Sequence, residues 1–538
     1  ARAGAIGSQP LPSPVVRRPA TLLLAALSVL HASAAGAYPF LAIRPGGTPF
    51  EGPTDPEMAA VFWNPAALGQ FRGAHIGGVG QLVIQHGSVQ RDAICTATGQ
   101  PGDCATMRTF PAANFVNPSG TGLGGFAWDF RNENLVLALV LYAPWESHRS
   151  FGGAGNPGST DTPTAYHLRS EDLTLAYVAL GASFKLSRIF TAGVNVSVVD
   201  GFATLAFDRD AALEPHACPR AARATDGSCT QPTWPGGSQT VDQVGYENPD
   251  YAERLRLHGD GGTFWGGIPT PTGLSIGVGG LLKVSERLTL GASWTRMFPL
   301  FVTTGRFGLG DLRGASVKPA PRLGDICPGG ACEGSVVIAW EVPDVYHFGG
   351  RFILREGLEL ASWVRVVVYG GYQRSTRERS MVVQIAGDAV DRAGVPSRIV
   401  LGRSLVPTFT GEIGLRWRMT PEIRLGFSLA AETSAVPTVA INPEAIDGPK
   451  VSGLAGVEVR VTRILRIYGG YDITGVVSEP LSHPSPGTFD PRATVRCADA
   501  SYALESCAAA LDGRGLPTAS GSYVLVTHHI NLGAFVDF

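Results

Sequence analysis

Eight cysteines are the residues of this chain best suited to covalent chemistry, and they form four pairs whose members are close in sequence. Thiols at such spacings either form disulfides or bind a metal. The pairs are Cys95 with Cys104, Cys218 with Cys229, Cys327 with Cys332, and Cys497 with Cys507. Metal binding is the weaker interpretation, because no Cys-x-x-Cys spacing and no flanking histidine cluster occurs. We predict four local disulfides, an exported protein and no cofactor.

Histidine and serine would be the residues to examine for an outer-membrane hydrolase such as a lipase. His528 and His529 are adjacent in a predicted strand, so their side chains point to opposite faces and at most one faces the interior. No serine can be assigned as the partner of either. The sequence therefore predicts a protein that is not an enzyme.

The beginning of the chain has the pattern of a secretory signal peptide. Arg17 and Arg18 precede an apolar run over 20–30, which is followed by small residues ending at Ala37. The run is too short for a membrane-spanning helix, which needs about 20 apolar residues. We assign 1–37 to the signal peptide and an upstream segment, and expect the mature chain to begin near Tyr38.

Alternation of apolar and polar residues is the main structural signal of the mature chain. Ile413, Leu415 and Trp417 alternate with Glu412 and Arg416, and similar segments follow after short turns. A period of two predicts strands with one apolar and one polar face. A soluble β-sandwich would show the same period with the apolar face inside, so alternation alone does not choose between the two.

The arrangement of the connections favours a membrane barrel. We count about fourteen strands, an even number as in single-chain bacterial barrels. Their expected starts are Ala74, Gly122, Leu135, Asp172, Thr191, Thr272, Leu288, Ser335, Leu358, Thr408, Ile423, Val451, Ile464 and Tyr523. Tight turns alternate with long connections, and all four cysteine pairs fall in the long ones. We predict an all-β, antiparallel transmembrane barrel over 73–538, with long extracellular loops.

The last strand and the composition agree with this class. Apolar residues alternate from Val524 to the terminal Phe538, and such an ending resembles the assembly signal of bacterial outer-membrane barrels. That resemblance implies the outer membrane, its lipid and the barrel assembly machinery as location and partners. The chain is 44% hydrophobic and 16% charged, with a formal net charge of −2. Without a basic stripe, nucleic acid is not an expected partner.

A Pro- and Gly-rich segment over 38–72 precedes the first strand and is a candidate plug, or hatch, for the lumen. Its sequence at 62–68 is Phe-Trp-Asn-Pro-Ala-Ala-Leu. Here the chain resembles the FadL family of long-chain fatty acid and hydrocarbon transporters, whose hatch carries an Asn-Pro-Ala motif. Asn64, Pro65 and Ala66 match that motif, about 27 residues after the expected cleavage site and just before a first strand.

Other phrases extend the resemblance over the mature chain. They are Val342-Pro343-Asp344, Ala435-Val436-Pro437, and Tyr-Ala-Pro-Trp at 142–145. The sequence departs from the family at the opening of the hatch, where 44–47 reads Arg-Pro-Gly-Gly, and in its cysteine-bearing loops. These departures concern the substrate more than the fold.

The resemblance implies passive transport of a long-chain fatty acid or another hydrophobic compound, with an apolar pocket, a shifting hatch and lateral release into the membrane. Asn64 before Pro65 predicts a fixed bend, with the amide hydrogen-bonded to the wall. The third strand, 135–143, is apolar at nearly every position, so it either packs on the hatch or lines the path. The candidate pocket and path residues are Phe62, Trp63, Leu139, Leu141, Trp145, Phe264, Trp265, Phe298 and Phe301.

Two alternatives remain at this stage. Each of these aromatic residues could instead belong to a girdle at the membrane interface. The barrel could also serve as an adaptor or surface anchor of a secretion or attachment system, with the long loops over 208–271 and 478–522 docking a partner.

Overall fold

The computed structural model describes residues 44–91, 94–95, 107–108, 112–151, 168–210, 252–260, 263–264, 268–269, 273–298, 301–311, 327, 332–340, 342–369, 380–388, 397–402, 405–436, 441, 446–476 and 521–538. The expected signal peptide and residues 38–43 lie outside this part of the chain. The statements below concern the described residues.

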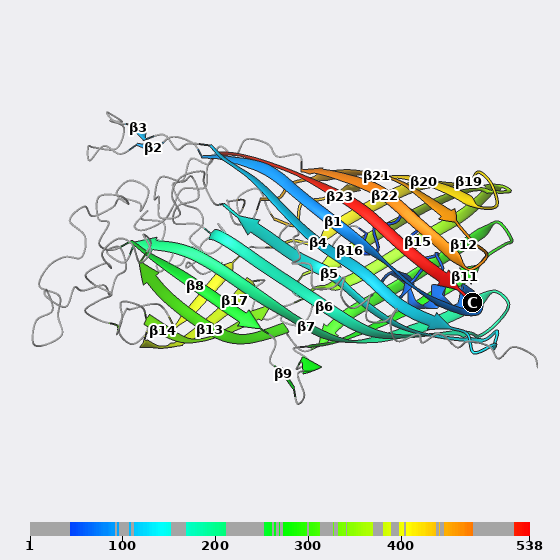
Figure 1. The fold of residues 1–538 in the computed structure, drawn as a ribbon, viewed down its shortest axis with the longest axis horizontal. Coiled ribbons are helices and arrows are strands. Elements are labelled where there is room, and N and C mark those ends of the chain that lie inside the picture. The colour runs from blue at the N-terminus through cyan, green and yellow to red at the C-terminus, as the bar shows by residue number, and fades with distance from the viewer. Residues whose placement is uncertain are drawn as a thin grey trace, which may run out of the picture.

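One antiparallel sheet closes into a barrel of fourteen wall strands (Figure 1). Nine wall strands are single elements: β1 (Ala74–Arg91), β4 (Ala113–Trp128), β5 (Leu135–Ser150), β6 (Leu168–Lys185), β7 (Phe190–Asp210), β20 (Ile423–Glu432), β21 (Lys450–Arg460), β22 (Leu465–Val476) and β23 (Gly521–Asp537).

The other five wall strands each consist of two elements. They are β8 (Ala252–Asp260) with β11 (Gly273–Lys283), β12 (Leu288–Phe298) with β13 (Phe301–Asp311), β14 (Cys332–Trp340) with β15 (Asp344–Arg355), β16 (Leu358–Val368) with β17 (Ser380–Gly387), and β18 (Arg398–Gly402) with β19 (Thr408–Arg418). Two small sheets lie apart from the wall: β2 (Ile94–Cys95) with β3 (Met107–Arg108), and β9 (Thr263–Phe264) with β10 (Ile268–Pro269).

The ring closes because β1 pairs with both β4 and β23. The β1–β23 ladder runs from His75 opposite Asp537 to Arg91 opposite Gly521. Each expected strand start lies within a different wall strand or one residue before it. The predicted all-β barrel of fourteen strands is therefore confirmed.

The tight turns lie together at the end of the barrel that is labelled C (Figure 1). They connect β4 to β5, β6 to β7, β11 to β12, β15 to β16, β19 to β20 and β21 to β22, as the sequence predicted. The longer connections leave from the opposite end. This inequality is typical of outer-membrane barrels, in which the short turns are periplasmic.

Burial resolves which face of the strands is outside. On β19, Phe409, Ile413 and Trp417 are exposed, whereas Glu412 and Arg416 are buried inside. The apolar faces therefore point outward, toward lipid, and the charged faces line the interior, which excludes a sandwich with an apolar core between its sheets. No described helix is both long and apolar enough to span a membrane.

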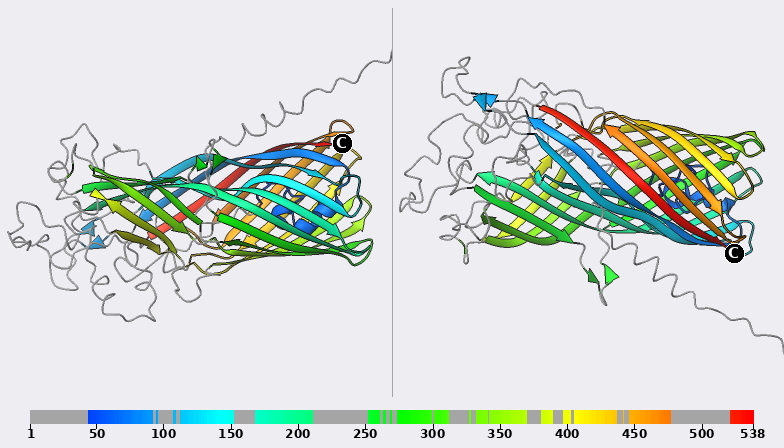
Figure 2. Two further views of the ribbon diagram at one scale, coloured as in Figure 1. Left: turned by 90° about the horizontal axis from the view of Figure 1, so that it is seen from below. Right: turned by 45° about the horizontal axis from the view of Figure 1, so that its top comes forward.

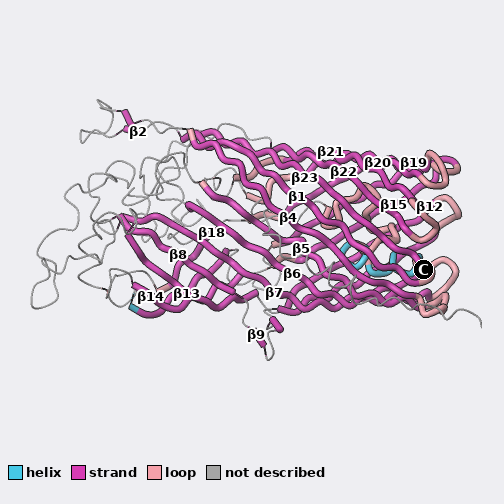
Figure 3. Tube along the Cα trace, in the orientation of Figure 1, coloured by secondary structure: helices cyan, strands magenta, loops and turns pink. Residues whose placement is uncertain are grey.

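The residues before β1 lie inside the barrel. This inner segment, residues 44–72, contains the short helices α2 (Ala60–Trp63) and η2 (Pro65–Gln70), which are seen between the walls in Figures 2 and 3. It contacts strands on several sides of the ring. The helix η2 contacts β6, β7 and β11, and Arg44 contacts β19 and β22. Trp63 and Asn64 are fully buried there.

Candidate functional site in the barrel interior

Buried ion pairs hold the first half of the inner segment against β19 and β22. Arg44 contacts Glu412 at 2.5 Å and Asp472 at 2.8 Å. Asp55 accepts two hydrogen bonds from the guanidinium of Arg416, one of them at 2.7 Å from Nη2 to Oδ2. The side chains of all these residues are nearly inaccessible to solvent. Such pairs are costly to break one partner at a time, because the other charge is left buried.

The Glu51 carboxylate folds the same half onto α2. It accepts hydrogen bonds from the backbone N–H groups of Gly46 and Thr48, at 3.1 and 2.9 Å, and from Nε1 of Trp63 at 3.0 Å. Burial raises the pKa of the Glu51 carboxyl, while these donors and Arg44 act in the opposite direction. Glu51 thus ties the charged half of the segment to the aromatic half.

Asn64 joins the second half to the opposite wall. Its Nδ2 donates to the carbonyl oxygens of Pro53 and Gly280, at 2.7 and 2.9 Å, and its Oδ1 accepts from the N–H of Ala66 at 3.1 Å. Asn64 therefore caps η2, with Pro65 in the first turn, where its missing N–H has no cost. The bond to the wall expected from the Asn-Pro sequence is present at Gly280.

Two wall glycines permit this close approach. A Cβ atom on Gly193 would lie 2.1 Å from the backbone nitrogen of Ala66, and one on Gly279 would lie 2.1 Å from Oδ1 of Asn64. No side chain fits at either position without displacing the segment. The matched Asn-Pro-Ala motif therefore lies in direct contact with β7 and β11.

Phe62 and Trp63 sit in a cluster of aromatic rings. Trp63 lies 4.7 Å from Trp363 and 4.8 Å from His347, between ring centroids. Phe62 lies 5.1 Å from His347 and 6.0 Å from Tyr142 on β5. The two candidate residues are thus brought together with three aromatic or imidazole rings of the wall. Their cluster forms the apolar centre of the otherwise polar interior.

The structure places the other candidate residues apart from that centre, with one exception. Trp145 is buried, only 2% exposed, on the inner face of β5. Leu139 is 48% exposed and Leu141 lies on the same outer face, because β5 alternates and its inner positions are Val136, Ala138, Val140 and Tyr142. The inner face of β5 packs on the inner segment, as one of the two interpretations of this strand expected.

The remaining candidates are aromatic residues near interrupted wall strands. Phe298 ends β12 and is half-buried, with the guanidinium of Arg296 4.7 Å from its ring. Phe301 begins β13 and Phe264 lies in β9, and only their backbones are described. Trp265 lies outside the described residues. A substrate role for these four residues stays a prediction.

Sequence reasoning missed several members of the cluster. Tyr142 and Tyr177 stack at 5.2 Å, and His347 and Trp363 enclose Trp63. Each lies at an inward position of an alternating strand. An aromatic residue at a position where polar residues are expected would have been the signal to follow.

The ladder between β4 and β5 is incomplete. It runs only from Trp128 opposite Leu137 to Leu123 opposite Tyr142, although both strands continue and remain paired to β1 and β6. Beyond Leu123 the two strands diverge, and we refer to this gap in the ladder, between 113–122 and 143–150, as the fork. It begins six residues from Trp128, or about 15 Å up the wall for a strand tilted by about 40°. That height lies within an apolar band of about 25 Å.

Two prolines explain where the fork forms. Pro144 lies in a bulge, at which the register with β6 shifts between Tyr142 and Trp145. Pro118 lies on the facing edge, in the part of β4 that pairs with β1 but not with β5. Proline lacks the N–H that a ladder needs, so within sheets it is confined to edges and bulges. The Tyr-Ala-Pro-Trp phrase singled out in the sequence is therefore the point at which β5 leaves β4.

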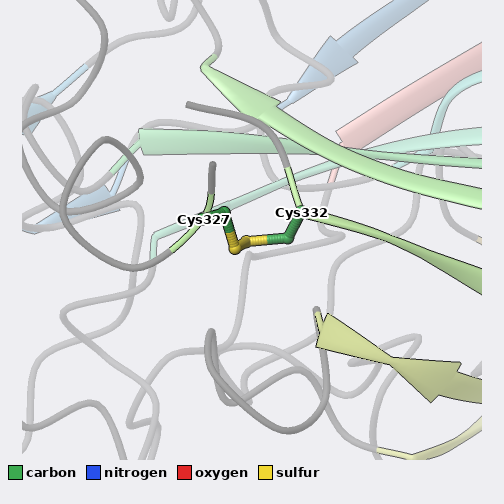
Figure 4. The surroundings of a disulfide bond; sticks show 2 residues. All are labelled: Cys327 and Cys332. Atoms are coloured by element: carbon green, nitrogen blue, oxygen red, sulfur yellow. A yellow bond between two sulfur atoms is a disulfide. The ribbon is translucent and has the colours of Figure 1, made fainter. Parts of the chain in front are cut away.

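Of the predicted disulfides, the structure contains the bond between Cys327 and Cys332 (Figure 4). It lies at the start of β14, at the end of the barrel away from the tight turns. Cys95 lies in β2, with only its backbone described, and Cys104, Cys218, Cys229, Cys497 and Cys507 lie outside the described residues. Those three pairings stay predictions.

The serine whose sequence context is most like that of a hydrolase, Ser275, lacks the surroundings of a nucleophile. Gly-Leu-Ser-Ile-Gly at 273–277 matches the Gly-x-Ser-x-Gly pattern, but it lies within β11 and not at a strand-to-helix turn. Ser275 donates a hydrogen bond to the carbonyl oxygen of Arg296 at 3.1 Å. His528 faces outward, where its Nδ1 lies 2.6 Å from the hydroxyl of Tyr471, and His529 faces inward.

No protein-family model matches the sequence, and no curated protein matches it by sequence. Solved structures do match. A Pseudomonas aeruginosa FadL homologue is 15% identical, with a TM-score of 0.65, over 94% of this chain and 100% of its own. The Pseudomonas putida toluene transporter TodX is 13% identical, with a TM-score of 0.54, over 94% and 98%.

A third similar structure, the Ralstonia pickettii toluene transporter TbuX, is 12% identical with a TM-score of 0.53, and covers 93% of this chain and 98% of its own. At such identities the likeness establishes the fold. It is the fold expected from Asn64, Pro65 and Ala66, and it extends over nearly the whole chain. This chain is therefore an outer-membrane β-barrel with a FadL-like fold.

Proposed function

We propose that this protein is a passive outer-membrane channel for hydrophobic compounds, either long-chain fatty acids or hydrocarbons. The observation that carries the proposal is the combination of a buried segment inside the barrel with a fork in the wall, whose lower end we estimate to lie at the height of the lipid. The names of the similar structures, a FadL homologue and toluene transporters, support the same class of substrate.

In this proposal, residues 38–72 act as the hatch and 73–538 as the barrel. A compound enters from the extracellular end, leaves water for the apolar centre around Phe62 and Trp63, and passes out between β4 and β5 into the membrane. Removal of apolar surface from water favours entry, and the exit transfers the compound between two apolar surroundings, so no nucleotide or other energy source is required. The expected partners of the protein are the hydrophobic compound, outer-membrane lipid and the barrel assembly machinery.

The two halves of the inner segment suggest which part moves. The first half is held by buried ion pairs, whereas the hydrogen bonds that join the Asn-Pro-Ala sequence to the wall are neutral: Asn64 to Gly280, and Ser183 Oγ to the carbonyl oxygen of Ala66 at 3.0 Å. A neutral hydrogen bond contributes about 1 kcal/mol, whereas a buried ion pair costs about 3 to 5 kcal/mol to break. The Asn-Pro-Ala half is therefore the part that we expect to shift.

The test is uptake of labelled oleate and of toluene by cells that carry the full chain, Asn64→Ala, or a version without the hatch. We expect the full chain to increase uptake of at least one compound over cells without it, and Asn64→Ala to change that uptake. Equal uptake of both compounds by all strains, with the barrel folded in the outer membrane, would refute transport. That result would favour the adaptor, whose expected docking loops lie mostly outside the described residues.

A further inference from the structure

Two buried polar atoms without hydrogen-bond partners lie on the inner edges of the fork, among the described residues. Asn117 on β4 is 5% exposed and Ser147 on β5 is fully buried. Within the described part of the chain, neither Nδ2 of Asn117 nor Oγ of Ser147 has a hydrogen-bond partner. A buried polar atom that lacks a partner is destabilising, so two of them on facing edges are unusual and require an explanation.

Two contacts across the fork define which residues face each other. At its lower end, Oγ1 of Thr121 donates to the carbonyl oxygen of Ala143 at 3.2 Å. At its upper end, the rings of Phe115 and Phe151 lie 5.2 Å apart, edge to face. The fork is therefore bounded at both ends, about 20 Å apart along β4. Between these contacts, Asn117 must face the stretch of β5 that begins at Ser147.

Large apolar side chains flank this polar pair, and Gln85, which is also buried, lies opposite Asn117 in the β1–β4 ladder. Phe115 and Phe151 lie above the pair, and Trp145 and Leu173 lie beside or below it, all of them buried. Hydrogen bonds formed in such surroundings are stronger than in water. A molecule that passes through the fork therefore meets buried apolar rings above and below the level of Asn117 and Ser147.

A positive and a negative side chain face each other two residues beyond Ser147. Arg149 and Glu171 are fully buried and lie directly opposite each other in the β5–β6 ladder. A carboxylate at the pair would thus add a second negative charge beside Glu171. An uncharged oxygen, such as that of an alcohol or a ketone, needs only the donors that Asn117 and Ser147 offer.

We propose that Asn117 and Ser147 bind the uncharged polar group of an amphipathic substrate as it passes through the fork. The inference rests on the proposed function and narrows its substrate class to long-chain compounds that carry a neutral hydrogen-bonding group. The amide Nδ2 donates to the substrate oxygen, and the serine hydroxyl donates or accepts. The apolar chain of the substrate lies below, beside Trp145.

The test compares uptake of labelled hexadecan-1-ol and hexadecane, two probes of equal chain length, by cells that carry the full-length protein. Asn117→Leu and Ser147→Ala should each lower hexadecanol uptake about three- to tenfold, the value of one hydrogen bond, and leave hexadecane uptake unchanged or higher. Ser147→Thr keeps the hydroxyl and should keep the preference for hexadecanol.

The controls lie on the same strands with their side chains on the outer face. Asn114 and Ser150 are exposed, so Asn114→Leu and Ser150→Ala should change neither uptake. Folding is checked for every variant by SDS gel electrophoresis, in which a folded barrel that has not been heated migrates differently from the heated, unfolded chain. If a folded Asn117→Leu or Ser147→Ala barrel takes up hexadecanol at the original rate, or loses both probes equally, the inference is overturned. If the original chain transports neither probe nor oleate nor toluene, the proposed function itself has failed.

Discussion

Replacement of Asp55 by asparagine tests whether the charged half of the inner segment holds the lumen shut. In the structure, Arg416 donates to both oxygens of Asp55, and Arg351 lies 3.7 Å from Oδ1. Asparagine keeps the size of the side chain and removes its charge. Arg416 would then be buried against the segment without its counterion.

The structure sets the size of the effect. Breaking a buried ion pair from one side costs about 3 to 5 kcal/mol, which is about 150- to 5,000-fold in an equilibrium. Arg416 keeps two other acceptors, the carbonyl oxygens of Pro49 and Glu51 at 3.0 and 3.2 Å. We therefore expect the lower end of that range, about 3 kcal/mol in favour of the displaced segment.

The assay is the sensitivity of cells to a large polar antibiotic such as vancomycin, which an occluded barrel excludes. Asp55→Asn should raise sensitivity and also raise basal uptake of oleate. Glu286→Gln is the matched control, since Glu286 pairs with Lys283 on the surface, with its side chain 90% exposed, and such pairs contribute about 0 to 1 kcal/mol. A folded Asp55→Asn barrel with the sensitivity of the original chain would refute the reasoning.

Three further changes probe other contacts. Pro144→Val restores an N–H at the bulge and should narrow the fork, lowering oleate uptake severalfold in an initial-rate assay; an unchanged rate would argue against exit at this point. In Gly193→Val, the new Cβ at position 193 would lie 2.1 Å from the backbone nitrogen of Ala66, so the variant should displace the inner segment and raise vancomycin sensitivity. Sensitivity equal to that of the original chain would mean that the wall moves instead. Cys327→Ser opens a short disulfide loop worth about 2 kcal/mol, so it should speed proteolysis of that loop while the unfolding temperature of the barrel stays the same.

The strands and their closure followed from the sequence because both depend on a local pattern. Alternation as at 412–417 specifies a strand and its two faces, and the tight turns specify the pairing of neighbours. The position of Asn64 was also predictable, since an amide before proline in an apolar phrase must find partners when it is buried.

Contacts between distant parts of the chain were not predictable in the same way. Leu139 and Leu141 look suited to a pocket, but only the register of the whole ring shows that their face of β5 meets lipid. The bulge at Pro144 then shifts the alternation of β5 by one residue. Ala143 faces outward, and Trp145, two residues later, faces inward. The partners of Trp63, such as His347 and Trp363, come from strands roughly 300 residues away, and no local pattern encodes that separation.

The seam between β1 and β23 has a consequence for biogenesis. Gln81 and Asn531 meet across it at 2.8 Å although they are 450 positions apart in the sequence, and Arg44 meets Asp472, which is 428 positions away. The cylinder cannot close until β23 has been synthesised, and Arg44 cannot meet its buried partner until β22 is in place. Closure of the wall and attachment of the inner segment therefore both depend on the last strands of the chain.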